Sequence, residues 1–183
     1  NTSLLNKEKS KMYSYYKLKV FENIKEEFLH IDTDTILYKN FHFQDSGREF
    51  IFSSPSDVGP EGLNENDFPN LVKTYAGPFY VLQEQHSDFM KENFKVSEIP
   101  NMSVIYAKDY VSMNLAAKKS IDHYNKNRKF IDGAGGECYI EQLMIHLNLM
   151  EINERYREQV RNKSTFLSHK EFLMLEQEYM GAT

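Results

Sequence analysis

Residues 28–40 read FLHIDTDTILYKN, a short apolar run that leads directly into two acids, Asp32 and Asp34. The apolar residues 28–31 predict a buried β-strand that ends where the acids begin. Ligands collect at the carboxyl ends of strands in open α/β sheets, and carboxylates at positions i and i+2 can face one divalent cation after a turn. Oxygen ligands of this kind suit Mn²⁺ or Mg²⁺. The segment therefore predicts a strand that ends at a metal site.

The alternative is that residues 32–35 form a polar turn that Asp32 caps. Two like charges beside a buried strand are costly unless a cation or hydrogen-bond donors offset them. That cost favours the metal site over the simple turn. His30 alternates with apolar neighbours on the strand, and we expect it to be a hydrogen-bonded interior histidine rather than a ligand.

Short apolar runs alternate with longer segments of helical periodicity on both sides of this stretch, which predicts an α/β fold whose C-terminal part is mostly helical. The predicted strands are 28–31, 49–52 and 103–107, and the predicted helices are 10–24, 78–93, 109–127, 139–150 and 151–161. Residues 172–180 could form a strand or a short helix. We expect one domain over residues 1–183, with a mobile segment at 1–9 and a loop at 53–66, where Pro, Gly and Ser gather.

The composition excludes several classes of partner. The net charge of -5 over 183 residues is the wrong sign for a surface that neutralises backbone phosphates, so we expect no nucleic-acid partner. No apolar stretch is long enough for a membrane span. The single cysteine, Cys138, cannot form an internal disulfide, which fits a reducing compartment. The first residue is Asn rather than Met, so we expect the natural start to lie upstream.

The acidic stretch also resembles the D-x-D region of GT-A glycosyltransferases, and is particularly similar to a group of bacterial relatives. In that group a histidine stands two residues before the motif, as His30 does here, and a lysine stands on the preceding helix, where this chain has Lys17. Residues 37–41, LYKNF, resemble the short strand and lysine that follow the motif in the same group.

Two later segments continue the resemblance. Residues 101–109, NMSVIYAKD, have the length of a family segment that lies by the donor sugar and the acceptor. Asn101 and Asp109 match it, whereas side chains replace its glycines at 103, 106 and 107. The Glu141-Gln142 pair resembles a Glu-Gln pair at the start of the family's C-terminal helix.

The resemblance implies a GT-A-like (Rossmann-like) mixed sheet flanked by helices, with parts missing from this sequence at both ends. It implies a nucleotide-sugar donor held by Mn²⁺ or Mg²⁺ through Asp34, with Asp32 on the metal or the ribose. The acceptor would be a saccharide or a lipid-linked hydroxyl, in the cytoplasm or at the periphery of the inner membrane. The residues that it assigns to the donor are Lys17, Asp32, Asn101 and Gln142, and those that it assigns to catalysis are Glu141 and Asp109.

Simpler roles exist for both catalytic candidates. Glu141 could be an acid that the positive end of a helix dipole favours. Asp109 opens a predicted helix, where an aspartate is most often a cap.

Two other functions fit parts of the sequence. The residues DTDT resemble the first motif of haloacid-dehalogenase-type phosphatases, in which Asp32 would be the covalent nucleophile and Asp34 the general acid/base. No strand followed by an acidic pair appears downstream, as that family requires. A non-catalytic binding domain, with the acids in a solvated turn, is the third possibility.

Overall fold

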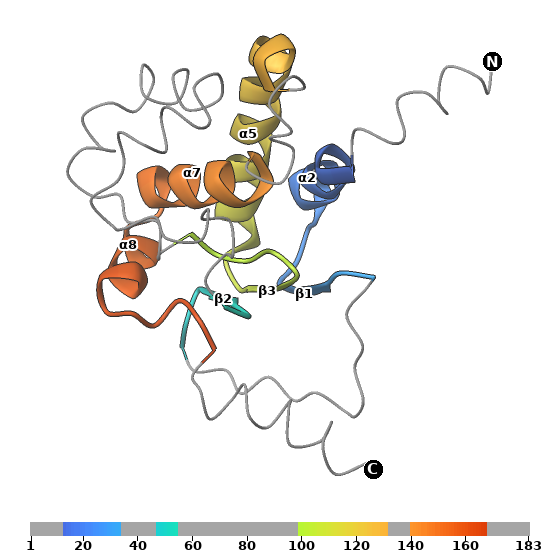
Figure 1. Ribbon diagram of the computed structural model, residues 1–183. Helices are drawn as coiled ribbons and strands as arrows, with labels where there is room; N and C mark the ends of the chain where they lie inside the picture. The colour runs from blue at the N-terminus through green and yellow to red at the C-terminus, as the bar shows by residue number, and fades with distance from the viewer. Residues whose placement is uncertain (1–12, 34–46, 55–98, 132–139, 168–183) are drawn as a thin grey trace, which may run out of the picture.

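The computed structural model describes residues 13–33, 47–54, 99–131 and 140–167 (Figure 1). Over these residues the chain combines a three-stranded sheet with four α-helices and one π-helical turn. The predicted α/β class is therefore confirmed at the level of a mixed α/β fold. The predicted helix at 78–93, the segments at 1–9 and 172–180, and most of the loop at 53–66 lie outside the described residues.

The three described strands lie where the apolar runs predicted them. They are β1 (Phe28–Ile31), β2 (Phe50–Phe52) and β3 (Val104–Ala107), and they pair in the order β1-β3-β2. Both pairings are antiparallel, with Ile31 opposite Val104 in the first. The backbone N–H of Asp32 continues this ladder by donating to the carbonyl of Ser103 at 2.8 Å. The end of β1 is therefore brought beside the start of β3, rather than beside the ends of parallel neighbours.

The prediction that residues 28–31 form a buried strand is wrong in its degree of burial. All four residues of β1 retain some exposure, and Leu29 is 39% exposed. β1 and β2 both lie at edges of the described sheet and both pair with β3, so the difference comes from packing: the ring of Tyr156 covers Phe50 and Phe52, and residues 165–167 bond to the outer edge of β2. The fully buried strand is β2, whose three side chains are all in the core.

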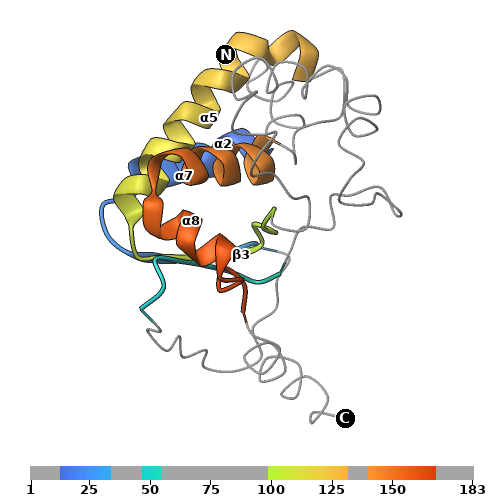
Figure 2. The same cartoon turned by 90° about the vertical axis from the view of Figure 1, so that its left-hand side faces the viewer.

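Four helices cover one side of the sheet (Figures 1 and 2). They are α2 (Tyr13–Asn23), α5 (Tyr110–Ile131), α7 (Ile145–Ile152) and α8 (Glu154–Arg161), and the π-helical turn η3 (Ile140–Met144) leads into α7. The predicted helix at 139–150 thus begins in a π-helical turn. The predicted boundary at 150/151 lies instead at Asn153, because its side chain accepts a hydrogen bond from the N–H of Tyr156 and so caps α8.

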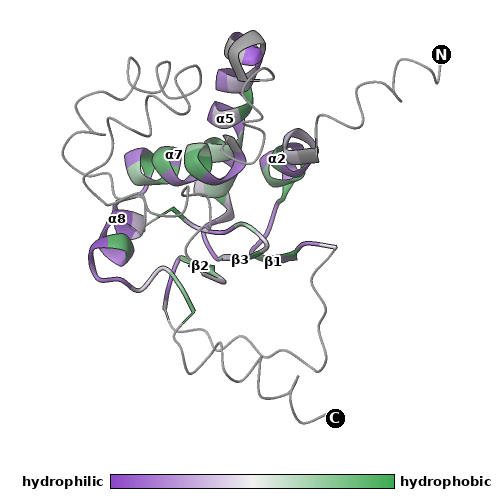
Figure 3. Cartoon of the chain, in the orientation of Figure 1, coloured by the Kyte–Doolittle hydropathy of each residue, from purple (hydrophilic) through white to green (hydrophobic). Residues whose placement is uncertain are grey.

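The core lies between these helices and the sheet. Helix α7 is apolar along most of its length (Figure 3), and its residues 145–150 are all buried. On the sheet side, the ring of Tyr156 packs edge-on against Phe50 and Phe52, with centroids 5.4 and 6.2 Å away. No described helix has both the length and the apolar character needed to cross a bilayer.

Candidate functional site

The buried face of α2 carries two polar residues. Its buried positions follow helical spacing and are Ser14, Lys17, Leu18 and Phe21. Leu18 and Phe21 belong to the apolar core. Ser14 and Lys17 lie one turn nearer the N-terminus of the helix. A lysine at such a position needs acceptors for its ammonium group, because an unpaired buried charge is strongly unfavourable.

Those acceptors come from three distant parts of the chain. The Nζ of Lys17 lies 2.8 and 3.1 Å from the two carboxylate oxygens of Asp32, and 2.6 Å from Oε1 of Glu141. It also donates to the carbonyl oxygen of Met102 at 2.6 Å. The Lys17 side chain is 5% exposed, and that of Glu141 is 7% exposed. Lys17, Asp32 and Glu141 therefore form one nearly buried ionic cluster, which we call the Lys17 cluster.

Asp32 has a second partner in the cluster. Its Oδ1 lies 2.8 Å from Nε2 of His30, whose ring meets Phe21 edge-on with centroids 5.1 Å apart. The expectation of a hydrogen-bonded histidine is confirmed. Burial lowers the pKa of His30, against the hydrogen bond to Asp32, which raises it. His30 therefore contacts Oδ1 of Asp32, one of the two carboxylate oxygens that Lys17 also contacts.

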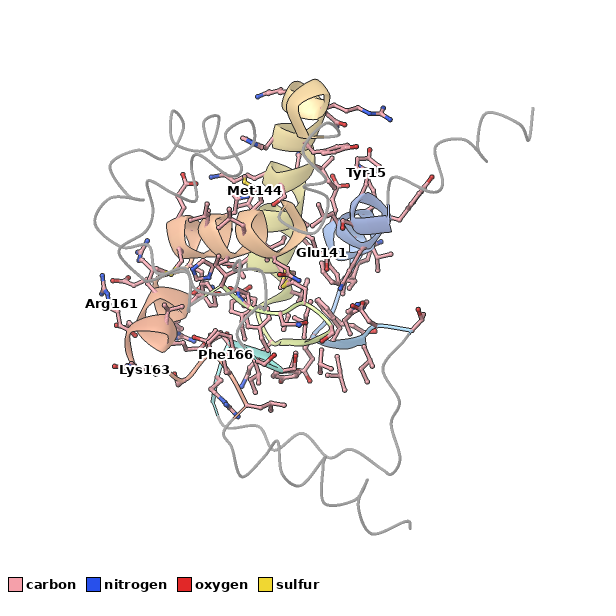
Figure 4. All side chains as sticks on the ribbon, in the orientation of Figure 1. Tyr15, Glu141, Met144, Arg161, Lys163 and Phe166 are labelled. Carbon is pink, nitrogen blue, oxygen red and sulfur yellow. The ribbon has the colours of Figure 1, made fainter. Side chains whose placement is uncertain are left out.

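Glu141 lies at the start of η3, at the end of the η3–α7 segment that is nearer to α2 (Figure 4). Burial raises its pKa, while the charge and hydrogen bond of Lys17 and a hydrogen bond from Ser14 lower it, and the charge of Asp32 raises it. Local π-helical turns occur often at functional sites, where they change the direction of a side chain. A desolvated carboxylate with a raised pKa is a suitable proton acceptor.

Asn101 and Asp109, the two residues that match the family segment at 101–109, have hydrogen-bond partners of their own. Oδ1 of Asn101 accepts a hydrogen bond from the N–H of Ser103 at 2.8 Å. This bond closes a turn that leads into β3, and the carbonyl of Met102 in the turn accepts from Lys17. Asp109 caps α5, because its carboxylate accepts from the N–H and the hydroxyl of Ser112 and from Nδ2 of Asn153. The structure thus gives Asp109 the capping contacts expected of an aspartate that opens a helix. The catalytic role that the resemblance assigns to Asp109 stays a prediction.

The predicted metal site is described in part. Asp32 lies in the Lys17 cluster, whereas Asp34 lies outside the described residues. Within the described ranges, no three His, Cys, Asp or Glu side chains are grouped closely enough to hold a metal ion. The oxygens of Asp32 have the chemistry that Mn²⁺ and Mg²⁺ prefer, and Mg²⁺ is usually held by one or two carboxylates together with substrate phosphates. Gln142 follows Glu141 on η3 and is half-buried.

Two members of the site were not predicted. The Met102 carbonyl is a backbone group, so no side-chain pattern could indicate it. Ser14 stands three residues before Lys17, and that spacing on a helix places both side chains on one face. This periodicity was the available signal for Ser14.

Comparisons with protein-family models, with curated proteins and with solved structures give no match, so the geometry of the Lys17 cluster and the quoted residues carry the functional argument.

Proposed function

We propose that this chain is a GT-A-type glycosyltransferase that moves a sugar from a nucleoside-diphosphate-sugar donor to an acceptor hydroxyl with the help of Mn²⁺ or Mg²⁺. One observation carries the proposal. The resemblance names four separate segments: the lysine on α2, the D-x-D stretch, the segment that starts at Asn101, and the Glu-Gln pair. All four contribute to the Lys17 cluster, through Lys17, Asp32, the Met102 carbonyl and Glu141.

This convergence is informative because the resemblance used only the order and types of residues. Lys17 and Glu141 are separated by 124 positions (141 minus 17), and their atoms meet at 2.6 Å. A chance likeness in four short segments gives no reason for groups from all four to meet in a nearly buried cluster. A polar turn at residues 32–35 would likewise not require a buried lysine as its partner.

The resemblance supplies the proposed roles, and the surroundings of each group are compatible with them. Asp32 lies on the donor side, where with Asp34 it would hold the metal ion. The ion's charge would stabilise the departing nucleoside diphosphate. Glu141 lies on the acceptor side, where its desolvated carboxylate orients the acceptor hydroxyl and takes its proton as the oxygen attacks the anomeric carbon. The acceptor is a saccharide or a lipid-linked hydroxyl, met in the cytoplasm or at the inner membrane.

Thermal unfolding tests the proposal. The wild-type chain would be measured with Mn²⁺ together with UDP, GDP or CDP in turn, and separately with Mg²⁺ and beryllium fluoride. We expect one nucleoside diphosphate to stabilise the chain, by about 2.7 kcal/mol at a hundred times its Kd. The variants Asp32→Asn and Asp34→Ala should lose this stabilisation. Asp122→Asn, at an exposed position of α5, is the matched control and should keep it.

The other outcomes separate the alternatives. Stabilisation by beryllium fluoride without a nucleotide effect would favour the phosphatase, in which Asp32 is phosphorylated. A response to none of these ligands would favour the non-catalytic binding domain.

A further inference from the structure

The ammonium group of Lys17 has no hydrogen left for a ligand. A lysine ammonium has three N–H donors and no acceptor. The three groups around Nζ are the Asp32 carboxylate, Oε1 of Glu141 and the Met102 carbonyl, at 2.6 to 3.1 Å. All three belong to the protein, and the side chain is 5% exposed. A diphosphate oxygen could reach Nζ only by displacing one of them.

Lys17 also lies between two acidic side chains, Asp32 and Glu141. Asp32 and Glu141 are both largely removed from water, with side chains 16% and 7% exposed. Two carboxylates in such a place repel each other unless a cation lies between them. Among the residues that the structure describes, the charged groups that act on Glu141 are Lys17 from α2 and Asp32 after β1, and Ser14 adds a neutral donor. Lys17 is the cation between the two acids.

We propose that Lys17 is a positioning residue, which holds the carboxylates of Asp32 and Glu141 in place and does not itself touch the donor. This inference rests on the proposed function, and it replaces the donor contact that the family resemblance implied for Lys17. Through one ammonium group, the donor side of the site at Asp32 is linked to the acceptor side at Glu141. The Met102 carbonyl fixes where along the start of β3 the ammonium lies.

The test compares Lys17→Met with Lys19→Met in the full chain. Lys19 lies two residues away on the same helix but pairs with Glu22 at the surface, so its substitution is the matched control. Two quantities are measured: the pKa of Glu141, from the pH dependence of its carboxyl ¹³C resonance, and the affinity for UDP, GDP or CDP with Mn²⁺, by calorimetry.

We expect Lys17→Met to raise the pKa of Glu141, because the positive charge that favours its ionised form is gone. Affinity for the nucleotide with Mn²⁺ should fall about 10- to 100-fold, as is typical when a residue that orients a metal ligand is removed. Lys19→Met should change neither quantity.

Three results would overturn the inference. An unchanged pKa of Glu141 with weaker nucleotide binding would mean that Lys17 contacts the donor directly. A raised pKa with unchanged nucleotide affinity would leave Lys17 as a structural counter-ion only. An unchanged pKa with unchanged affinity would remove both roles.

The two proposals can fail separately. A wild-type chain that binds none of the three nucleotides with Mn²⁺ contradicts the proposed function, whatever the pKa of Glu141 does. Where Lys17→Met does not fold, Asp32→Asn tests the same link from the other side. This variant removes the negative charge of Asp32, which raises the pKa of Glu141, so the pKa of Glu141 should fall. An unchanged value there contradicts the inference.

Discussion

His146 shows how one buried residue can control the pH dependence of stability. It lies on α7, 1% exposed, and its Nδ1 shares a hydrogen bond of 2.8 Å with Oη of Tyr156. Burial lowers the pKa of His146 to about 3 from a usual 6.5. Its apolar neighbours on α7 explain why the ring is kept neutral in the folded chain.

The sign of the resulting pH effect follows from linkage. Above pH 6.5 neither state binds the proton, so His146 has no effect. Between about pH 6.5 and 3 the unfolded chain binds a proton that the folded chain does not, so the free energy of unfolding falls as the pH falls. The full slope for one such group is about 1.4 kcal/mol per pH unit. Glu141, whose pKa is raised, acts in the opposite direction.

His146→Gln should therefore flatten the decline of stability below pH 6.5, because glutamine cannot be protonated. Urea unfolding of wild type and variant between pH 8 and pH 4 measures this, and the contribution of Glu141 cancels in the difference between the two chains. The measurement at pH 8 gives the cost of the substitution itself. Equal slopes in the two chains would contradict the neutral, buried state of His146.

At the scale of elements, α8 illustrates what local pattern can and cannot predict. The helix was expected from its periodicity, and its end is closed by a backbone motif. The N–H of Ser164 donates to the carbonyl of Gln159, and that of Lys163 donates to the carbonyl of Val160. Lys163 has φ 54°, in the left-handed region where glycine is usual after a helix.

Lys163→Gly should raise the free energy of unfolding by about 1 kcal/mol, because glycine adopts this backbone conformation without the steric cost that a Cβ brings. Chemical denaturation measures the gain. Lys163→Ala is the control, since it removes the long side chain but keeps the Cβ, and should give no comparable gain. A glycine variant no more stable than the alanine variant would show that Lys163 is not strained.

The same helix carries a contact that no local pattern indicates. Oε1 of Gln159 accepts from the N–H groups of Glu49 and Phe50, and its Nε2 donates to the Phe50 carbonyl at 2.7 Å. Residues 165–167 add backbone bonds to Phe52, from the carbonyl of Thr165 and the N–H of Leu167. The backbone groups on the side of β2 away from β3 are therefore hydrogen-bonded to a segment that lies more than a hundred residues later in the chain. Figure 4 shows Phe166 beside this strand.

At the scale of the whole molecule, the Lys17 cluster joins α2, the end of β1, the start of β3 and η3. Lys17→Met should lower the free energy of unfolding by about 3 to 5 kcal/mol, because it leaves two largely buried acids without their cation. Lys19→Met should cost less than about 0.5 kcal/mol, since the Lys19–Glu22 pair is partly solvated. Urea denaturation of both variants at pH 7 measures the difference. Equal losses would mean that the cluster does not stabilise the fold.

The sequence by itself determined the local elements and the candidate residues. Apolar runs and helical periodicity placed all three described strands and all four described α-helices, because these patterns depend on neighbours within a few residues. Family likeness selected Lys17, Asp32 and Glu141. Only the tertiary structure decided that β1 lies at an edge of the described sheet and that Asp32 and Glu141 share the ammonium group of Lys17. The β1–β3 pairing and the Lys17–Glu141 contact join segments about 70 to 120 residues apart, and desolvation at such contacts cannot be predicted from local pattern.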